Sequence, residues 1–502
     1  MEPTPTNQPP SQRRIGLPLP ISGFVAVLAR LASRLTGREG GVLPGRVLLA
    51  LTPRALEQLS RRARKRGRRT ILVSATNGKT TLTAMLAEML EAEGLEVVHN
   101  VTGANLRSGI ITTMFQSRGR GDVAVLETDE ATLPLVAPDI QPDVILLGNL
   151  FRDQLDRFGE LEVLADRWRA MLDALDPSRV TVVFDADDPL IAALVDEHVV
   201  QAAARGIDAH VVPYGMDDAS VAQPGLPHAA DSRFCRRCSA PLVYDHSWVG
   251  HLGAWHCDSC GLTRPELDVA ATRVALDGLG ATELHVDTRA GAVDVRLRIP
   301  GLYNVYNAVG AIAAASTLGV APDRIAEALG EASPSFGRFE RIPVPGGGTI
   351  TLLLVKNPTG LNEVVRTLTS SGIDVKASLF ALNDLTADGR DTSWIWDADI
   401  EPLLEQAGAI VVTGERAAEF GLRAIYGGLA PEGVLYEPDI EDALYRVLER
   451  ARQFTEHHHA YALVTYTAML KMRAIIADQG WARSYWANEP RSRSRGRTKV
   501  RR

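Results

Sequence analysis

The sequence predicts an α/β protein with a central, mostly parallel sheet, an inserted cysteine cluster, and a second, smaller α/β domain. Short apolar runs bounded by turn residues alternate with helix-length segments, which is typical of βαβ units around a buried parallel sheet. The first run, T-I-L-V (70–73), leads into a Gly-Lys-Thr loop and then an amphipathic helix. All four cysteines fall between residues 235 and 260, where they interrupt this alternation.

Length and charge limit the classes of function. The chain has 502 residues, of which 45% are apolar and 23% charged, as in a globular protein of several domains. No run approaches the ~18 apolar residues of a membrane span. The net charge of −7 includes seven positive charges in the last twelve residues, so the remaining chain is acidic. An acidic chain argues against a general nucleic-acid-binding surface. Because the cysteines form one cluster and not a spread-out disulfide framework, we expect a cytoplasmic protein.

The termini differ from the rest of the chain. The proline-rich, polar start is unlike a signal peptide. An amphipathic helix is predicted over 21–35, where packing on the main domain is favoured over lying on a membrane surface. We expect five regions: disordered 1–18, helical 19–60, a central domain 61–341 with an insertion at about 228–266, a C-terminal domain 342–480, and a basic disordered tail 481–502.

The segment V-S-A-T-N-G-K-T-T (73–81) predicts a phosphate cradle. It stands between a strand and a helix N-terminus, where unpaired N–H groups and the helix dipole attract an anion. Lys79 is placed to reach the terminal phosphates of a nucleotide and Thr80 to hold Mg²⁺. The usual phosphate-loop pattern has glycine where Val73 stands, so an ordinary strand–turn–helix is the alternative interpretation.

Polar residues follow several of the predicted strands, which cover 95–99, 122–127, 143–149 and 180–185. Ligands of parallel sheets bind at the carboxyl ends of strands, and Mg²⁺ takes oxygen ligands. These residues therefore predict a magnesium site, with helix N-caps as the alternative; they are Asn77, Glu127, Asp129, Glu130, Asn149, Asp185, Asp187 and Asp188.

The cysteines predict a structural zinc site. Cys235, Cys238, Cys257 and Cys260 form C-x₂-C-x₁₈-C-x₂-C, and a small residue or glycine follows each pair. Four thiolates complete a tetrahedral shell and leave no open position for catalysis. A redox pair is the alternative, and the neighbouring His251 and His256 are not expected to be ligands.

The second half of the chain repeats the α/β pattern. Residues 267–300 alternate as antiparallel strands do, and 301–315 predict a helix of small residues. A second series of strands is predicted at 349–355, 377–383, 409–414 and 461–467, again with polar residues at the strand ends.

Together these motifs resemble the Mur ligase family of ATP-dependent amide-forming enzymes, over residues 45–475. The cradle S-A-T-N-G-K-T-T is similar to the family's G-T-N-G-K-T, and Glu127 stands at the family's Mg²⁺ carboxylate. The resemblance implies a Mur ligase-type central domain. It also implies ATP and Mg²⁺ as cofactors, Lys79 and Glu127 as catalytic residues, and Thr80 and Glu127 as magnesium ligands. The implied nucleotide-binding residues are Thr76, Asn77, Gly78, Lys79, Thr80, Thr81, Asn304, Asn307 and Arg338 (from G-R-x-E, 337–340).

The departures from the family resemble one branch of it, the MurT subunits of lipid II isoglutaminyl synthase. That branch shares the four-cysteine insertion, N-L-F-R-D-Q-L-D-R-F-G-E (149–160), K-N-P-x-G (356–360) and A-D-G-R-D-x-S-W-I-W-D (387–397). No lysine lies between 153 and 180, where several family members carry a carbamylated one.

This resemblance implies amidation of the D-glutamate α-carboxylate of lipid II to D-isoglutamine, through an acyl phosphate, at the inner face of the plasma membrane. The resemblance also implies that ammonia comes from a GatD glutaminase partner in a heterodimer. No cysteine lies outside the zinc cluster to serve as a thiol nucleophile, which supports a separate glutaminase. Asp391 is implied to complete the partner's Cys-His pair, whereas the residues alone favour an Asx-turn or N-cap at Asp391.

Two other functions stay open at this point. A Mur-type or folylpolyglutamate-type ligase that adds an amino acid would share the ATP site, although the missing lysine and the cysteine insertion argue against it. A zinc-containing nucleic-acid-binding ATPase would use the cysteine knuckles and the basic tail, against which the acidic body argues.

Overall fold

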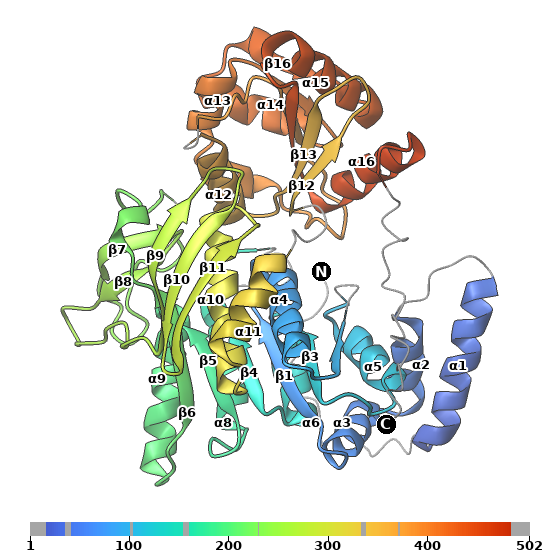
Figure 1. The fold of residues 1–502 in the computed structure, drawn as a ribbon, viewed down its shortest axis with the longest axis vertical. Coiled ribbons are helices and arrows are strands. Elements are labelled where there is room, and N and C mark those ends of the chain that lie inside the picture. Colours follow the sequence, from blue (N-terminus) through green and yellow to red (C-terminus); the bar gives the residue numbers. More distant parts are fainter. Residues whose placement is uncertain are drawn as a thin grey trace, which may run out of the picture.

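The computed structural model describes residues 17–35, 42–100, 104–153, 160–228, 230–332, 338–369 and 372–482. Nearly all of the two predicted disordered ends lies outside these residues. The described chain forms a nine-stranded sheet, a six-stranded sheet and a two-stranded ribbon. Figure 1 shows the six-stranded sheet and its helices above the larger sheet. The predicted α/β class is confirmed.

The nine-stranded sheet runs in the order β11-β10-β9-β6-β5-β4-β1-β3-β2. Pairs from β2 to β9 are parallel, and β9, β10 and β11 pair antiparallel, as residues 267–300 predicted. The strands are β1 (Arg69–Ser74), β2 (Val97–His99), β3 (Val123–Glu127), β4 (Val144–Leu147), β5 (Thr181–Asp185), β6 (His210–Met216), β9 (Val269–Leu276), β10 (Thr282–Thr288) and β11 (Gly291–Leu297).

Helices cover both faces of this sheet because alternate strand residues point to opposite sides. Leu72 and Leu126 pack in one core with α2 (Leu43–Leu51), α3 (Ala55–Arg64), α5 (Arg107–Gln116), α6 (Leu133–Ile140), α8 (Leu161–Asp173) and α9 (Pro189–Ala204). Ile71 and Val125 pack in the other with α4 (Lys79–Ala92), α10 (Leu302–Thr317) and α11 (Pro322–Glu331). The helix predicted over 21–35 is α1 (Leu19–Leu35), which packs on α2.

The cysteine insertion follows β6. It begins with the short helix η1 (Ala219–Val221) and contains the antiparallel ribbon of β7 (Val243–Val249) and β8 (Leu252–His256). Trp248 and Leu252 bury themselves in the core that α4 and α10 share, so the insertion is part of the central domain's packing.

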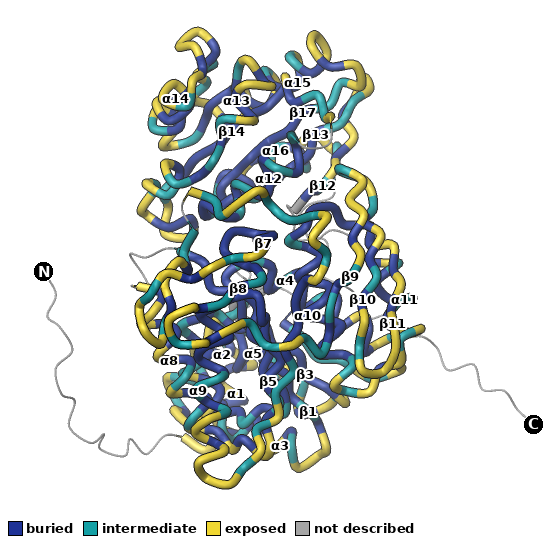
Figure 2. Tube along the Cα trace, turned by 90° about the vertical axis from the view of Figure 1, so that its left-hand side faces the viewer, coloured by how far each residue is buried: buried dark blue, intermediate teal, exposed yellow. Residues whose placement is uncertain are grey.

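The six-stranded sheet has the order β12-β13-β17-β14-β15-β16, with only the β12–β13 pair antiparallel. Figure 2 shows its buried strands enclosed by helices. The strands are β12 (Arg338–Pro343), β13 (Thr349–Leu354), β14 (Ser378–Ala381), β15 (Ile410–Thr413), β16 (Val434–Tyr436) and β17 (His459–Val464). The helices are α12 (Pro358–Thr369), η2 (Ser393–Asp397), α13 (Glu401–Ala407), α14 (Ala417–Tyr426), η3 (Pro431–Gly433), α15 (Ile440–Phe454) and α16 (Tyr466–Asp478).

One strand boundary in this domain was predicted wrongly. The strand expected over 461–467 ends at Val464, and α16 begins at Tyr466. Thr465 stands between the two elements, where its hydroxyl accepts a hydrogen bond from the Asn383 amide at 3.0 Å. The β-branched and apolar residues of this segment do not reveal such a turn, because the turn is set by a contact with the end of another strand.

Candidate active site and metal centre

The predicted cradle lies between β1 and the N-terminus of α4. Gly78 adopts φ +90°, a conformation that residues with a side chain rarely adopt. A Cβ added there would lie 1.9 Å from Oδ1 of Asn307, so glycine is also required by the close approach of α10. The backbone N–H groups at the start of α4 therefore face a site that α10 closes from one side.

Lys79 is buried at the first position of α4 and pairs with a carboxylate. Its Nζ lies 2.8 Å from Oε2 of Glu130, in the segment after β3. Burial by itself lowers the pKa of Lys79, but Glu130, Glu127 and Asp129 together raise that pKa above its ordinary value. Burial raises the pKa of Glu130, but the positive charges of Lys79 and Lys356 lower it further, so the pKa of Glu130 lies below its ordinary value. Both groups are therefore charged at neutral pH.

Glu127 ends β3 and is buried. Its Oε1 accepts a hydrogen bond from Nδ2 of Asn105 at 3.1 Å. The side-chain amide of Asn100 accepts a hydrogen bond from the backbone N–H of Glu127 and donates one to the backbone carbonyl of Glu127. Thr80 is half-buried and Thr81 is buried in the first turn of α4. Glu127, Asp129 and Glu130 thus place three carboxylates near the cradle, a donor set of oxygens that suits Mg²⁺.

The segment after β4 holds the cradle in shape. Asn149 accepts a hydrogen bond from the Asn77 amide at 2.8 Å and donates one to the Asn77 carbonyl at 3.1 Å. The Thr76 amide donates to the Asn149 carbonyl at 2.7 Å, and the Phe151 amide donates to the Thr76 hydroxyl at 3.1 Å. Asp153 belongs to the same segment 149–160 that the sequence analysis singled out, of which residues 154–159 lie outside the described chain.

Two residues of the C-terminal domain reach the cradle. Lys356 donates a hydrogen bond to the Thr76 carbonyl at 3.1 Å and forms an ion pair with Asp153. Asn357 exchanges amide hydrogen bonds with Asn77. Sequence reasoning noted the K-N-P-T-G segment but assigned these side chains no role. The available signal was a lysine directly after a buried strand.

A cavity beside the cradle separates the two domains. Asn307 lines it, whereas Asn304 is buried behind it and donates to the Pro300 carbonyl at 2.6 Å. Phe339, with a positive φ of 55° at a β-bulge, stacks on Tyr303 at a centroid distance of 6.2 Å. The side chain of Arg338 lies outside the described residues. Other lining residues are Asn77, Gly78, Asn149, Phe151, Tyr306, Lys356 and Glu363.

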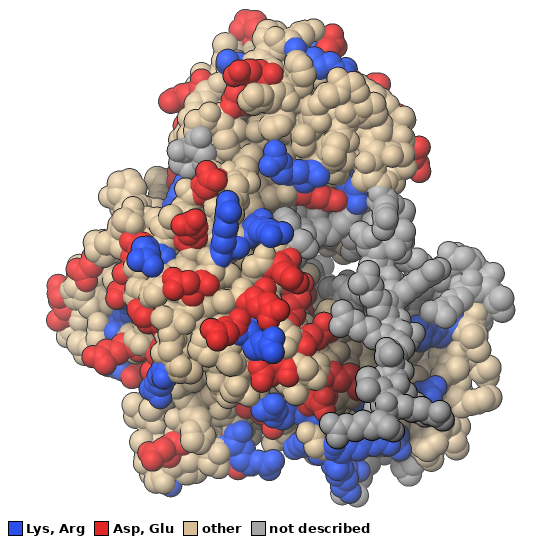
Figure 3. Space-filling model, in the orientation of Figure 1, with Lys and Arg blue, Asp and Glu red and all other residues tan. Residues whose placement is uncertain are grey.

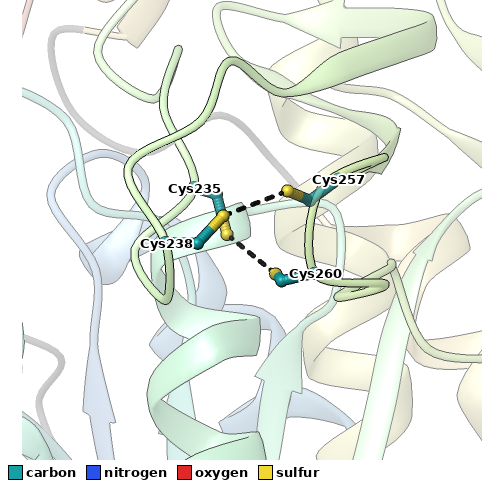
Figure 4. A group of neighbouring side chains, drawn as sticks. All are labelled: Cys235, Cys238, Cys257 and Cys260. Carbon is teal, nitrogen blue, oxygen red and sulfur yellow. Dashed lines mark hydrogen bonds between the residues drawn. The ribbon is translucent and has the colours of Figure 1, made fainter.

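The four cysteines converge as the spacing predicted (Figure 4). Their sulfur atoms all lie within 4.8 Å of one another, with Cys235–Cys260 at 3.6 Å and Cys238–Cys257 at 3.5 Å. Four ligands at about 2.3 Å from a central zinc would have sulfur–sulfur separations close to these. Each knuckle turns through a positive φ, at Ser239 (60°) and Gly261 (72°). Among the described residues this group contains no histidine.

Two of the three aspartates around the end of β5 contact the insertion, Asp187 through Arg264 and Asp188 through His251 at 3.3 Å. Asp188 is the N-cap of α9 and accepts from Leu190 and Ile191, as the alternative interpretation had it. Asp187 pairs with Arg264 at 2.7 Å and accepts from the Tyr306 hydroxyl at 2.6 Å. Burial and then the charges of Asp187 and Asp188 raise the pKa of Asp185 well above its ordinary value.

Asp391 lies in the C-terminal domain on an exposed loop before η2. Its Oδ1 accepts a hydrogen bond from the Ser393 amide at 2.9 Å, which is the Asx-turn that the residues alone favoured. Close by, Trp396 (45% exposed) and Tyr426 (75% exposed) form an edge-to-face pair at 5.7 Å. Exposed aromatic side chains are typical of a protein interface.

Comparisons with known proteins agree with this architecture. The model of the Mur ligase middle domain matches residues 73–224, and that of the MurT ligase C-terminal domain matches 354–469. Subunit MurT of lipid II isoglutaminyl synthase (glutamine-hydrolyzing) from Streptococcus pneumoniae is 32% identical over 458 residues, 90% of this chain and 94% of that protein. The MurT subunit of Staphylococcus aureus strain N315 is 30% identical over 455 residues, 89% of this chain and 95% of that protein.

Solved structures share the fold at low sequence identity. A pseudomurein peptide ligase type C from Methanothermus fervidus has a TM-score of 0.61 at 21% identity, over 82% of this chain and 79% of that one. The folylpolyglutamate synthase of Mycobacterium tuberculosis, complexed with ADP, has a TM-score of 0.58 at 16% identity, over 86% and 94% of the two chains.

Proposed function

Because the chain belongs to the Mur ligase family, within its MurT branch, we propose that it amidates the D-glutamate α-carboxylate of the lipid II stem peptide to D-isoglutamine. It is a carbon–nitrogen ligase of peptidoglycan synthesis that uses glutamine as the nitrogen donor. The proposal rests on Lys79 and Lys356, two cations that reach the cradle from different domains. Their positive charges support a site that binds anionic phosphate groups.

The reaction consumes ATP because a carboxylate is a poor acyl donor. An oxygen of the substrate carboxylate attacks the γ-phosphorus, the bond to ADP breaks, and an acyl phosphate forms. Ammonia then attacks the acyl carbon, inorganic phosphate leaves, and the nitrogen loses a proton to give the amide. Both steps develop negative charge on phosphoryl oxygens, which positioned cations and N–H groups stabilise.

This chain's residues fit these steps. The N–H groups at the start of α4 and the Lys79 ammonium would hold the β- and γ-phosphates, with Glu130 keeping Lys79 oriented. Lys356 would contact the transferred phosphoryl group. The adenine would lie in the interdomain cavity against Asn307 and the Tyr303–Phe339 pair. Thr76, Asn77, Gly78, Thr80 and Thr81 would line the phosphates. Asn304 accepts a hydrogen bond from Asn307 at 3.1 Å and would hold Asn307 at the purine end, which Arg338 would complete.

Metal ions fit two places. Mg²⁺ would be held by Thr80 and Glu127, where it would neutralise phosphate charge. The buried position of Glu127 beside two further carboxylates supports this assignment. Zn²⁺ would be held by the four cysteines as a structural ion, since four sulfurs complete its shell.

We further propose that a GatD glutaminase subunit supplies the ammonia. All four cysteines of the chain lie in the knuckles, so this chain offers no other thiol for glutamine hydrolysis. Asp391 would orient the imidazole of the partner's Cys-His pair, with its Asx-turn holding the carboxylate in position. The exposed Trp396–Tyr426 pair would pack against that partner.

The test combines the chain with a co-expressed glutaminase subunit, ATP, glutamine and lipid II. We expect lipid II to lose the mass difference between a hydroxyl and an amino group, with one ATP consumed per product. Lys79→Ala is the matched inactive control. A gain of an amino-acid residue mass would identify an amino-acid-adding ligase instead and overturn the proposal.

A further inference from the structure

The helix α1 is anchored along one face. Leu19, Ser22 and Ala26 are buried against the helices below, and the Thr52 hydroxyl donates a hydrogen bond to that of Ser22 at 2.7 Å. A Cβ added to Gly23 would meet the ring of Phe115 at 3.0 Å. These contacts fix the rotation of α1 about its axis, so the direction of its other face is set by the fold.

The other face of α1 is apolar and exposed. Ile21, Phe24, Leu28 and Leu31 follow Leu17 at helical spacing, and Val25 and Val27 widen the stripe. Phe24 is 66% and Leu28 49% exposed. Single exposed apolar residues are ordinary on a protein surface, but six on one helix, with Leu17 just before it, form a patch that marks a binding face.

The same end of the molecule is strongly basic. Residues 17–35 and 42–69 hold eleven Lys and Arg residues and one acidic residue, Glu57, a net charge of +10 in a chain whose total is −7. Arg46, Arg54, Arg61 and Arg62 are exposed. Figure 3 shows Lys and Arg side chains along the lower edge of the molecule, where Figure 1 places α3. This charge is complementary to an anionic surface.

We propose that the apolar face of α1, which we call the docking face, lies in the surface of an anionic lipid bilayer. The described chain contains no helix long and apolar enough to cross a membrane, so α1 would lie in the headgroup region. The apolar side chains of the docking face would enter the boundary between the lipid headgroups and the acyl chains, and the arginines of α2 and α3 would attract the lipid phosphates. The proposal concerns where the chain docks and does not depend on the reaction assigned to its active site.

The test is co-sedimentation of the full chain, without ATP or partner, with sucrose-loaded vesicles. We expect binding to phosphatidylcholine vesicles that contain about 30% phosphatidylglycerol and weak binding to phosphatidylcholine alone. The double variant Phe24→Glu/Leu28→Glu should bind at least roughly tenfold more weakly, because it places two charges in the apolar stripe. Arg61→Glu/Arg62→Glu should weaken binding and reduce its sensitivity to salt.

A matched control adds the same charges elsewhere. Val200→Glu/Leu276→Glu changes two exposed apolar residues of α9 and β9 and should bind vesicles as the wild type does. Equal binding of the Phe24→Glu/Leu28→Glu variant and the wild type, or no binding of the wild type to anionic vesicles, would overturn the proposal. Light scattering that shows a dimer dissolved by Phe24→Glu/Leu28→Glu, without vesicle binding, would assign the docking face to a second copy.

Discussion

Asn77 of the cradle and Asn357 of the C-terminal domain donate amide hydrogen bonds to each other, at 3.2 and 3.0 Å. The two residues are 280 positions apart, and Asn77 also bonds to Asn149 through its backbone. The loop that would hold the phosphates is therefore the same loop that positions the second domain. The position of the second domain and the shape of this loop are therefore coupled through the Asn77–Asn357 pair.

Asn357→Asp should raise the KM for ATP. The substitution keeps the Oδ1 that accepts from the Gly360 amide at 2.8 Å, but it removes the Nδ2 donor to Asn77. Losing one buried hydrogen bond of about 1–2 kcal/mol corresponds to roughly a tenfold rise in KM. Steady-state kinetics with saturating lipid II measure it. Asn362→Asp, which bonds within its own domain, serves as the control. An unchanged KM would remove the proposed coupling.

Glu130→Gln should make nucleotide binding sensitive to high pH. The raised pKa of Lys79 means that its stabilising contribution is present below the unfolded-state pKa and is lost as pH rises through the folded-state pKa. The lowered pKa of Glu130 gives a contribution that is present above its unfolded-state pKa and is lost as pH falls through the folded-state value.

In the wild type the charge on Lys79 should therefore persist as pH rises above neutral. Without the Glu130 charge the pKa of Lys79 falls, and binding by the variant should weaken toward the alkaline end. Titration calorimetry at several pH values measures this difference. A variant whose affinity follows the wild-type profile would show that Glu127 and Asp129 suffice to keep Lys79 charged.

Cys257→Ser should release the metal. Burial raises the pKa of Cys257, but hydrogen bonds from the Cys260 amide, the Cys238 thiol and the Ser259 amide outweigh burial and lower that pKa to about 7, which favours a thiolate ligand. Mass spectrometry should find about one zinc per wild-type chain, with less in the variant and a Tm lower by several degrees. Ser259→Ala, in the same knuckle, should retain the ion. Less than about 0.3 zinc per wild-type chain after mild purification would refute a zinc site.

Asp185→Asn should stabilise the protein more at pH 8 than at pH 5. Burial and the neighbouring aspartates raise the folded-state pKa of Asp185, so the folded protein binds this proton more tightly than the unfolded chain. The wild type therefore loses stability as pH rises from the unfolded-state pKa toward the folded-state value, and asparagine, which does not ionise, avoids that loss. Urea unfolding at both pH values measures the difference, with the exposed Asp208→Asn as the control. A stability difference that is equal at both pH values would contradict this account.

Asp391→Asn should reduce amidation that uses glutamine but not amidation that uses free ammonium. Asparagine retains the Oδ1 that accepts from the Ser393 amide, so the loop and the complex with the glutaminase subunit should persist. Glutamine-dependent amidation should fall by about a hundredfold or more, because the imidazole loses its carboxylate partner, whereas amidation with ammonium chloride should continue. Asp442→Asn on α15 is the control. Full glutamine-dependent activity would defeat the assignment of Asp391.

The sequence alone determined the parts of this protein that depend on neighbouring residues. A branched apolar run, a glycine at positive φ and an amphipathic helix define the cradle within residues 70–94, and the two cysteine pairs define their knuckles by spacing. Such features follow from backbone geometry and hydrogen bonding within a few residues. The alternation of strands and helices likewise predicted most of both sheets, but it missed β6, β12 and β16 and the turn at Thr465.

The tertiary structure alone decided which side chains meet. Glu130 pairs with Lys79 across 51 positions, and Lys356 reaches the Thr76 carbonyl across 280. Phe339 and Tyr303 come together in the cavity wall, and the rotation of α1 leaves its apolar stripe uncovered. These relationships depend on how one element packs against another that is distant in sequence, and no local pattern encodes that direction. The residue types were therefore readable from the sequence, whereas their partners required the packed fold.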